Sequence, residues 1–380
     1  MDSKIKIAYL IVNKSFPGLL KQIKYDRCLM ENLDGFDWNN FTFLDALDKE
    51  NYYKRLPFLF RGLFSKKLFA WLWLLKNARK YDYVIMRHME FDPFSIVFAF
   101  FVRNRILVHH SMEVEELLLI RNNWQGVIAS YVEKICGGIA VRTSCALLTV
   151  SRDLMDYQRE SRKLSPSFPI FHFPNGIIVK NTPILNDLVN NNQKVEIGFM
   201  AGRFAPWHGL DLLLDYCEKD VNNNFEKDII FHLIGDIKSI YIKQIKFINK
   251  FNGKIAIKIH GSMKQSEYLK IFDKCTIGIG SLAMYRIGLT DGCTLKVREM
   301  LAMGLPVFSG HKDTALPIDF PFYFSEGGNI DAILYFANKM SKVTRKEVRS
   351  ASYIYIDKKK WVDNLADDLK TLHSNRLNNF

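Results

Sequence analysis

The chain has 380 residues, of which 48% are hydrophobic and 13% aromatic, which excludes general disorder and favours two globular domains. A formal net charge of +13 indicates an anionic partner: nucleic acid, an acidic membrane surface or a phosphorylated ligand. The six cysteines show no C-x-x-C spacing, so neither a zinc site nor a disulfide framework is expected, and a cytoplasmic location fits best. No run approaches the roughly 20 apolar residues that a membrane-spanning helix needs.

Short apolar runs rich in β-branched and aromatic residues alternate with stretches of helical periodicity along the whole chain. Such alternation is typical of parallel sheets whose strands are joined by helices. The expected strands lie at 5–12, 83–86, 105–108, 147–150, 196–200, 229–234, 255–259, 276–280 and 306–308. The predicted fold class is therefore α/β, with doubly wound parallel sheets.

A polar stretch at 181–193, which contains Pro183 and ends in three asparagines and a glutamine, separates two such alternating blocks. We expect an N-terminal domain at 1–180 and a C-terminal domain at 181–357. Apolar residues at helical spacing in 358–372 predict a terminal helix, at about 358–380, that packs back on the N-terminal domain. Two α/β halves facing each other across a cleft would bind ligands at the carboxyl ends of their strands.

Residues 198–209 form a glycine-bearing turn between an expected strand and an expected helix. Such a turn can present backbone N–H groups to a phosphate, and Arg203 offers a permanently charged fork for its oxygens. The alternative is an ordinary strand-to-helix loop with a surface arginine.

A second polar, glycine-containing loop at 288–294 precedes an expected helix that ends at Gly304. The amides of residues 292–295 would cradle a diphosphate, and the helix dipole would add to the attraction. Glu299, one turn into that helix, could accept hydrogen bonds from both hydroxyls of a ribose. The alternative is that Glu299 and Lys296 are ordinary surface residues of a helix.

Residues 202–203, 207–209 and 291–307 together resemble the donor-binding domain of retaining glycosyltransferases of family 4, the group 1 enzymes of bacterial surface-polysaccharide synthesis. Shorter segments at 149–151, 173–177 and 233–236 agree with that family, and the N-terminal half matches it more loosely. The resemblance implies the GT-B fold, which consists of two Rossmann-like domains. It also implies transfer of a sugar from a nucleotide-diphosphate sugar with retention of anomeric configuration.

The resemblance assigns the donor diphosphate to Gly202 and Arg203 and to the loop and helix start that follow Asp291. The donor-binding residues expected there are Gly292, Cys293, Thr294, Leu295, Lys296 and Glu299. His208 stands where the family usually has a lysine, so either His208 is protonated beside the diphosphate or Lys296 supplies the missing charge.

The paired acidic residues of the family correspond to Asp291, which would face the transferred sugar, and Glu299, which would face the ribose. In retaining enzymes of this fold the leaving phosphate helps to deprotonate the acceptor, so no carboxylate nucleophile is needed. Asp291, Arg203 and His110 are the expected catalytic residues, with His109 as the alternative to His110. Either histidine could instead be a packed interior residue.

On the acceptor side the resemblance points to Gly18, Lys21 and His109. The sequence contains no Asp-x-Asp motif, so we expect no metal ion and no cofactor other than the nucleotide sugar. Neutralisation of the leaving diphosphate would then fall to side-chain cations and helix dipoles.

Eight basic residues alternate with aromatic residues in 53–80, a pattern typical of contact with an anionic membrane surface. The alternative is that the aromatics fill the core and the lysines are solvated. With a membrane, the acceptor would be a lipid-linked saccharide at the inner face of the plasma membrane. The competing functions are a non-enzymatic nucleic-acid-binding protein, suggested by the charge, and a GT-B nucleotide-sugar epimerase.

Overall fold

The computed structural model describes residues 4–14, 17–45, 53–121, 123–188, 194–220, 225–325 and 329–378. The chain divides into two compact units, the first comprising Met1–Pro174 with Lys358–Phe380 and the second Asn175–Asp357. The division falls between Pro174 and Asn175, whereas the sequence pattern had placed it after residue 180. Part of the polar stretch at 181–193 lies outside the described residues.

Unit 1 is built on a parallel sheet with the strand order β3-β2-β1-β4-β5-β6-β7. Its strands are β1 (Ile5–Asn13), β2 (Phe36–Leu44), β3 (Lys54–Arg55), β4 (Tyr83–Arg87), β5 (Arg105–His109), β6 (Ala146–Thr149) and β7 (Ile170–His172). Its α-helices are α1 (Pro17–Met30), α2 (Leu63–Asn77), α3 (Ser95–Phe98), α4 (Glu113–Ile120), α5 (Trp124–Arg142), α6 (Arg152–Ser161) and α13 (Lys358–Asn378).

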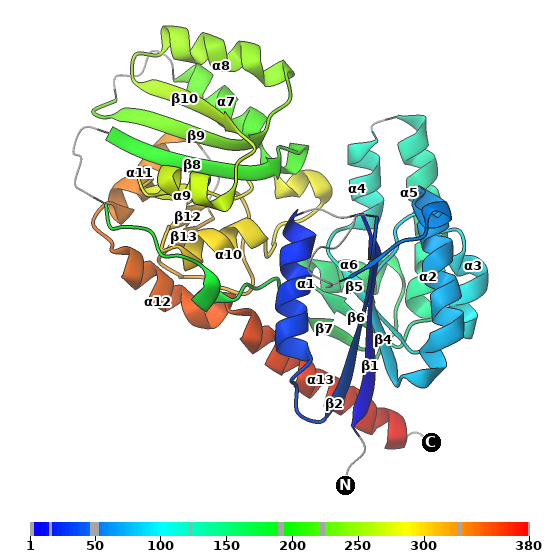
Figure 1. The fold of residues 1–380 in the computed structure, drawn as a ribbon. Helices are drawn as coiled ribbons and strands as arrows, with labels where there is room; N and C mark the ends of the chain where they lie inside the picture. The colour runs from blue at the N-terminus through cyan, green and yellow to red at the C-terminus, as the bar shows by residue number, and fades with distance from the viewer. Residues whose placement is uncertain are drawn as a thin grey trace. The chain divides into compact units, whose positions relative to one another are not determined.

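The helices of unit 1 cover both faces of its sheet, with α2, α3 and α5 on one face and α1 and α13 on the other (Figure 1). Strands β4, β5 and β6 are buried along almost their whole length, as expected for strands covered on both faces. Trp71 and Leu74 of α2 are buried in the core between the sheet and its helices.

The C-terminal helix α13 belongs to unit 1, although unit 2 lies between them in the sequence. At its start, Lys358 forms an ion pair of 3.3 Å with Asp26 of α1. Further along, Leu365 and Leu369 are buried, and near its end Arg376 donates a hydrogen bond of 3.3 Å to the carbonyl of Asp82. The helix is thus attached along its length.

Unit 2 has a six-stranded parallel sheet with the order β10-β9-β8-β11-β12-β13. Its strands are β8 (Lys194–Arg203), β9 (Asp228–Asp236), β10 (Ile255–Gly261), β11 (Ile277–Ile279), β12 (Val307–Phe308) and β13 (Tyr323–Phe324). Its α-helices are α7 (Leu210–Lys219), α8 (Ile240–Phe251), α9 (Gln265–Phe272), α10 (Leu295–Ala302), α11 (Ile330–Met340) and α12 (Arg345–Ile356).

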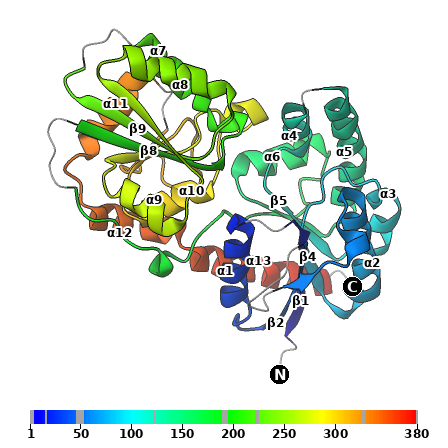
Figure 2. The same cartoon turned by 45° about the horizontal axis from the view of Figure 1, so that its top comes forward.

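In unit 2, α7 and α8 cover one face of the sheet and α9 and α10 the other (Figure 2). Two parallel sheets, each flanked by helices, confirm the α/β fold class. Within the described residues, no helix is both long and apolar enough to cross a membrane.

Candidate functional site

The candidate donor site of unit 2 lies where the order of its strands reverses. Strand β8 pairs with β9 on one side and β11 on the other. From β8 the chain proceeds outward through β9 to β10, and from β11 it proceeds the other way through β12 to β13. In an open parallel sheet such a reversal leaves a crevice at the carboxyl ends of the two central strands, where ligands bind. Of the two glycine-bearing turns identified in the sequence, the turn at 198–209 continues from the end of β8, and the loop at 288–294 follows β11.

At the end of β8 the chain passes through an irregularity between Met200 and Arg203. Gly202 is exposed, and a Cβ added there would meet no atom within 4 Å. The Arg203 side chain is 75% exposed, and its Nε lies 3.8 Å from a carboxylate oxygen of Asp236 at the end of β9. Such a loose, solvated pair is weak, so the guanidinium remains available to an anionic ligand.

The turn after β8 forms a short 3-10 helix, η5 (Pro206–His208), that ends at Gly209. Gly209 has a left-handed φ of 73°, and a Cβ there would lie 2.8 Å from the Cβ of Leu282. Both constraints favour glycine at this position. Arg286 fixes the turn by a 2.6 Å ion pair with Asp211 and a hydrogen bond of 2.9 Å to the carbonyl of Pro206.

The structure shows which atoms of His208 are engaged in the turn. Its Nδ1 accepts a hydrogen bond of 2.9 Å from the backbone N–H of Ala205, which places the ring proton on Nε2. Burial and the nearby Lys296 lower the pKa of His208 to about 2. In the ligand-free protein burial therefore keeps the His208 ring neutral.

Lys296 reaches the same edge of the sheet from the first turn of α10. Its Nζ donates a hydrogen bond of 3.1 Å to the carbonyl of Gly280, just beyond β11, and lies 5.3 Å from the ring centre of Phe199 in β8. Burial lowers its pKa to about 7. A diphosphate beside this amine would favour the charged form and raise that pKa again.

The loop before α10 differs in one respect from the sequence-based expectation. The N–H of Gly292 donates to the carbonyl of Lys312 at 2.9 Å, so this amide is not available to a diphosphate. Residue 294 is the N-cap of α10, its side chain makes no capping bond, and its buried Oγ1 has no hydrogen-bond partner among the described residues. The first amides of a helix have no partner within it, so the amides of residues 295–297 have none within α10.

Polar contacts fix the shape of this loop. Asn175, the first residue of unit 2, donates a hydrogen bond of 2.8 Å to the carbonyl of Cys293. Arg298 and Asp313 form a fully buried ion pair of 2.7 Å, and the Cys293 thiol lies 3.4 Å from the same Asp313 oxygen. Arg298 also donates to the carbonyl of Asn175. The sequence analysis had assigned no role to Arg298 or Asp313, because the pair joins α10 to a separate loop.

The two acidic residues of the expected motif are placed differently. Asp291 is only 3% exposed and lies opposite Lys312 in an isolated parallel bridge. Glu299 is half-buried on α10, one turn after Lys296. Leu295, also expected at the site, is the first residue of that helix.

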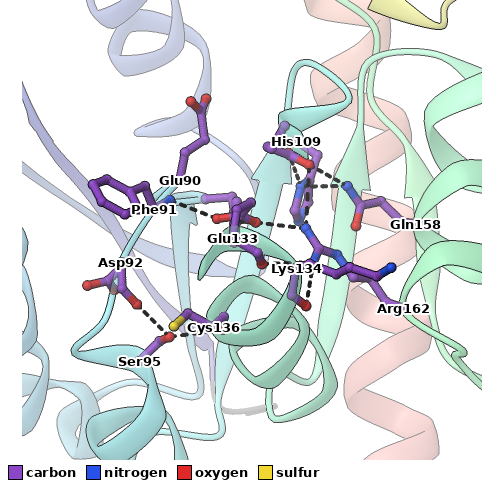
Figure 3. Close-up of polar contacts among 12 residues, drawn as sticks. Glu90, Phe91, Asp92, Ser95, His109, Glu133, Lys134, Cys136, Gln158 and Arg162 are labelled. Carbon is purple, nitrogen blue, oxygen red and sulfur yellow. Dashed lines mark hydrogen bonds and ion pairs between the residues drawn. The ribbon is translucent and has the colours of Figure 1, made fainter. Parts of the chain in front are cut away.

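In unit 1, His109 at the end of β5 is part of a buried polar network (Figure 3). Its Nδ1 donates to a carboxylate oxygen of Glu113 at 2.5 Å, and Gln158 donates to the other oxygen at 2.9 Å. Burial alone would raise the pKa of Glu113, but His109 and other nearby cations hold it below its usual range. The His109 side chain is fully buried in this network, and its assignment to the acceptor side stays a prediction.

A second group of side chains surrounds Glu133 of α5 in the same interior. His88 contacts one Glu133 oxygen at 2.9 Å, Arg162 contacts the same oxygen at 2.7 Å, and the backbone N–H of Phe91 donates to the other. The His88 ring stacks on that of His109 with centroids 4.6 Å apart. These contacts fix the chain that leaves β4 and β5.

His110, the expected catalytic histidine, is half-buried next to this network. Burial, followed by the positive charge of Arg87, lowers its pKa well below the usual value, so its ring is neutral. Gly18 and Lys21 lie in α1, and the positions of their side chains are outside what the structure describes.

Glu90 is a candidate that the sequence analysis missed. It follows the end of β4, is half-buried, and points away from the Glu133 group (Figure 3). Burial and the nearby carboxylates of Glu116 and Glu113 raise its pKa to about 7. A carboxyl group that titrates near neutrality at a strand end is a common property of functional sites. No sequence motif marks it, because the raised pKa arises from burial and from residues of α4.

Among the described residues, no group of three or more histidine, cysteine, aspartate or glutamate side chains is arranged to hold a metal ion.

No protein-family model matches this sequence, and no curated protein matches it. Solved structures do match. HepE from Anabaena, in complex with UDP and glucose, has a TM-score of 0.62 and 14% identity over 97% of this chain and 100% of its own. An alpha-glucosyltransferase in complex with UDP and a mismatched 13-mer DNA has a TM-score of 0.56 and 14% identity over 97% and 99%. AviGT4, a glycosyltransferase of avilamycin A biosynthesis, has a TM-score of 0.55 and 12% identity over 98% of both chains. At this identity the likeness establishes the GT-B fold.

Proposed function

We propose that this protein is a glycosyltransferase that takes a sugar from a nucleotide-diphosphate sugar bound by unit 2. The observation that carries this proposal is the meeting of Lys296, His208 and the uncapped start of α10 at the β8–β11 edge. An amine that titrates near neutrality, beside helix amides that have no partner within the helix, is suited to bind a diphosphate. The solved structures of the same fold that contain UDP agree with a nucleotide donor.

We assign the donor groups as follows. The diphosphate lies on the amides of residues 295–297, with Lys296, Arg203 and the Nε2–H of His208 as side-chain donors. Glu299 binds the ribose hydroxyls. Asp291 is largely buried, so it acts on the sugar through the shape of the loop unless ligand binding exposes it.

We further propose that transfer retains the anomeric configuration and needs no metal ion. The bond from the sugar to the diphosphate breaks, the acceptor hydroxyl bonds on the same face of the sugar, and its proton passes to the leaving diphosphate. The cations of unit 2 stabilise the charge that develops on that diphosphate. His110, as a neutral ring, positions the acceptor hydroxyl, and the acceptor is a saccharide, which we propose is linked to a lipid.

Thermal-shift screening with UDP, GDP, ADP and CMP sugars tests the donor class. We expect one nucleotide series to raise the melting temperature, by ligand linkage, and Lys296→Met to remove most of that rise. Lys270→Met changes an exposed lysine of α9 and is the matched control. If no nucleotide stabilises the protein, or if Lys296→Met responds like Lys270→Met, the proposed donor site is wrong.

A donor-consumption assay separates transfer from epimerisation. An epimerase would convert the donor without any acceptor, whereas a transferase needs an added acceptor for full turnover. The expected result is that saccharide acceptors increase donor consumption at least tenfold over the rate in buffer. Acceptor-independent conversion to an epimeric donor would instead favour the epimerase.

A further inference from the structure

Exposed apolar side chains are concentrated on one part of unit 1. Seventeen of the twenty-seven large hydrophobic side chains that are exposed among the described residues lie between residues 58 and 135. They include Phe101 at 65% exposure, Trp124 at 70% and Tyr131 at 66%. Apolar patches of this extent mark interaction sites on monomeric proteins. We call this part of unit 1, made of α2, α3, α4, α5 and the turns that precede and follow them, the apolar surface.

The helices of the apolar surface are neighbours in space. Figures 1 and 2 both show α2, α3 and α5 on the same face of the sheet, with α4 beside α5. Trp71 of α2 contacts Phe98 of α3, with ring centroids 6.1 Å apart. Between α2 and the end of α4, the Phe91 ring lies 5.4 Å from the Lys67 amine and 5.7 Å from the Arg121 guanidinium.

The exposed charged side chains of this part of unit 1 are of one sign. Across the described residues of 53–142, none of the seven acidic residues is exposed, and Asp92, Glu113 and Glu133 are buried. Nine basic residues of the same stretch are exposed: Lys54, Arg55, Lys76, Arg79, Lys80, Arg87, Arg103, Lys134 and Arg142. Lys134 lies on α5 between the exposed Tyr131 and Ile135, so cation and apolar groups share one helix face. This combination is complementary to an anionic surface with an apolar interior.

The structure changes which residues of the basic-aromatic stretch 53–80 face solvent. Trp71 is buried and Trp73 is half-buried against the core, whereas Phe58 is 80% exposed. Part of the stretch therefore fills the core, as the alternative interpretation held. Eleven of the seventeen exposed apolar side chains lie instead between residues 96 and 135.

We propose that the apolar surface docks on the face of an anionic lipid bilayer, with Trp124, Ile128 and Tyr131 of α5 in the headgroup region and the exposed cations at the lipid phosphates. Tryptophan and tyrosine prefer this interfacial depth, and basic residues near the surface add electrostatic attraction that salt weakens. A second copy of this chain would bury the same apolar groups but would need exposed acidic residues opposite the exposed cations. Within the described residues of 53–142, no acidic residue is exposed. This proposal extends the lipid-linked acceptor of the proposed function. The reason for docking rests on that function, whereas the docking itself can be tested without it.

Co-sedimentation of the full chain with extruded vesicles tests the docking. Vesicles of equal parts phosphatidylglycerol and phosphatidylcholine should bind the protein at least tenfold more tightly than pure phosphatidylcholine, and binding should weaken with salt. Trp124→Gln with Ile128→Gln should weaken binding at least tenfold, and Arg103→Gln with Lys134→Gln should remove most of the preference for anionic lipid. These side chains are exposed, so the variants should keep the melting temperature of the wild type.

The matched controls change exposed residues of unit 2, namely Ile318→Gln with Tyr335→Gln for the apolar pair and Lys339→Gln with Lys342→Gln for the basic pair. They should bind vesicles as the wild type does. Absence of vesicle binding, or equal loss in variants and controls, would overturn the proposal. A concentration-dependent dimer that the α5 substitutions dissociate would also overturn the proposal. Salt-sensitive binding of DNA without binding of vesicles would overturn it as well. Nucleotide sugars should still raise the melting temperature of all these variants. Failure of the membrane-docking proposal can therefore be distinguished from failure of the proposed donor site.

Discussion

Lys296 carries a titratable charge at the proposed donor site because burial brings its pKa to about 7, whereas burial keeps His208 beside it neutral in the ligand-free protein. The two side chains are far apart in the sequence, and only the meeting of η5 with the start of α10 brings them together. A lysine in the place of His208 would put two cations next to each other in the ligand-free protein. The histidine avoids that repulsion and still offers Nε2–H to a phosphate oxygen.

The pKa of Lys296 predicts how nucleotide binding depends on pH. Below pH 7 the amine is charged and binds the diphosphate without taking up a proton. Above pH 7 it is neutral in the free protein, and binding must take up one proton, so affinity should fall by up to about tenfold per pH unit between pH 7.5 and 9. Calorimetric titration across this range would check it. An affinity that is constant from pH 7 to 9 would contradict the assignment of Lys296.

At the scale of elements, α10 is held by the buried Arg298–Asp313 pair, which links its first turn to the chain after β12. Removing one partner leaves the other charge buried, and we expect Arg298→Met to lower the free energy of unfolding by about 3–5 kcal/mol. The double variant Arg298→Met with Asp313→Leu should recover most of this loss. Denaturant unfolding would measure both. Equal stability of wild type and Arg298→Met would show that the pair is not formed.

The apolar runs of the sequence predicted strands at the positions of β1, β4, β5, β6, β8, β9, β10, β11 and β12, and the structure has all nine. The sequence analysis missed β2, where Asp37 and two asparagines interrupt the apolar pattern, and the short strands β3, β7 and β13. These four lie at or next to the edges of their sheets, where fewer neighbours demand apolar residues. Local pattern therefore predicts the central strands better than the outer ones.

The sequence motifs predicted which loops form the candidate site but not how their atoms are engaged. That Gly292 gives its amide to Lys312, and that Gln158 binds the Glu113 carboxylate beside His109, depend on residues brought in by other elements. The raised pKa of Glu90 likewise depends on α4. Such long-range contacts leave no local signal in the sequence.

At the scale of the whole molecule, the chain returns to unit 1 through α13 after completing unit 2. Leu365 and Leu369 of this helix are buried, and each change to alanine should lower the stability of unit 1 by about 2–5 kcal/mol. Leu377→Ala, at an exposed position of the same helix, is the control. Thermal unfolding followed by near-ultraviolet circular dichroism would check this. Similar melting temperatures for Leu369→Ala and Leu377→Ala would mean that α13 does not stabilise unit 1.

The measurement that tests the proposed donor site most directly is a calorimetric comparison of a nucleoside with its diphosphate at pH 7. We predict that the wild type binds the diphosphate of the preferred base at least 100-fold more tightly than the nucleoside, because Lys296 and the start of α10 contact only the phosphates. Lys296→Met should reduce this preference at least tenfold while the affinity for the nucleoside stays the same. Equal affinities for nucleoside and diphosphate in the wild type would contradict the diphosphate site and the sugar transfer proposed from it.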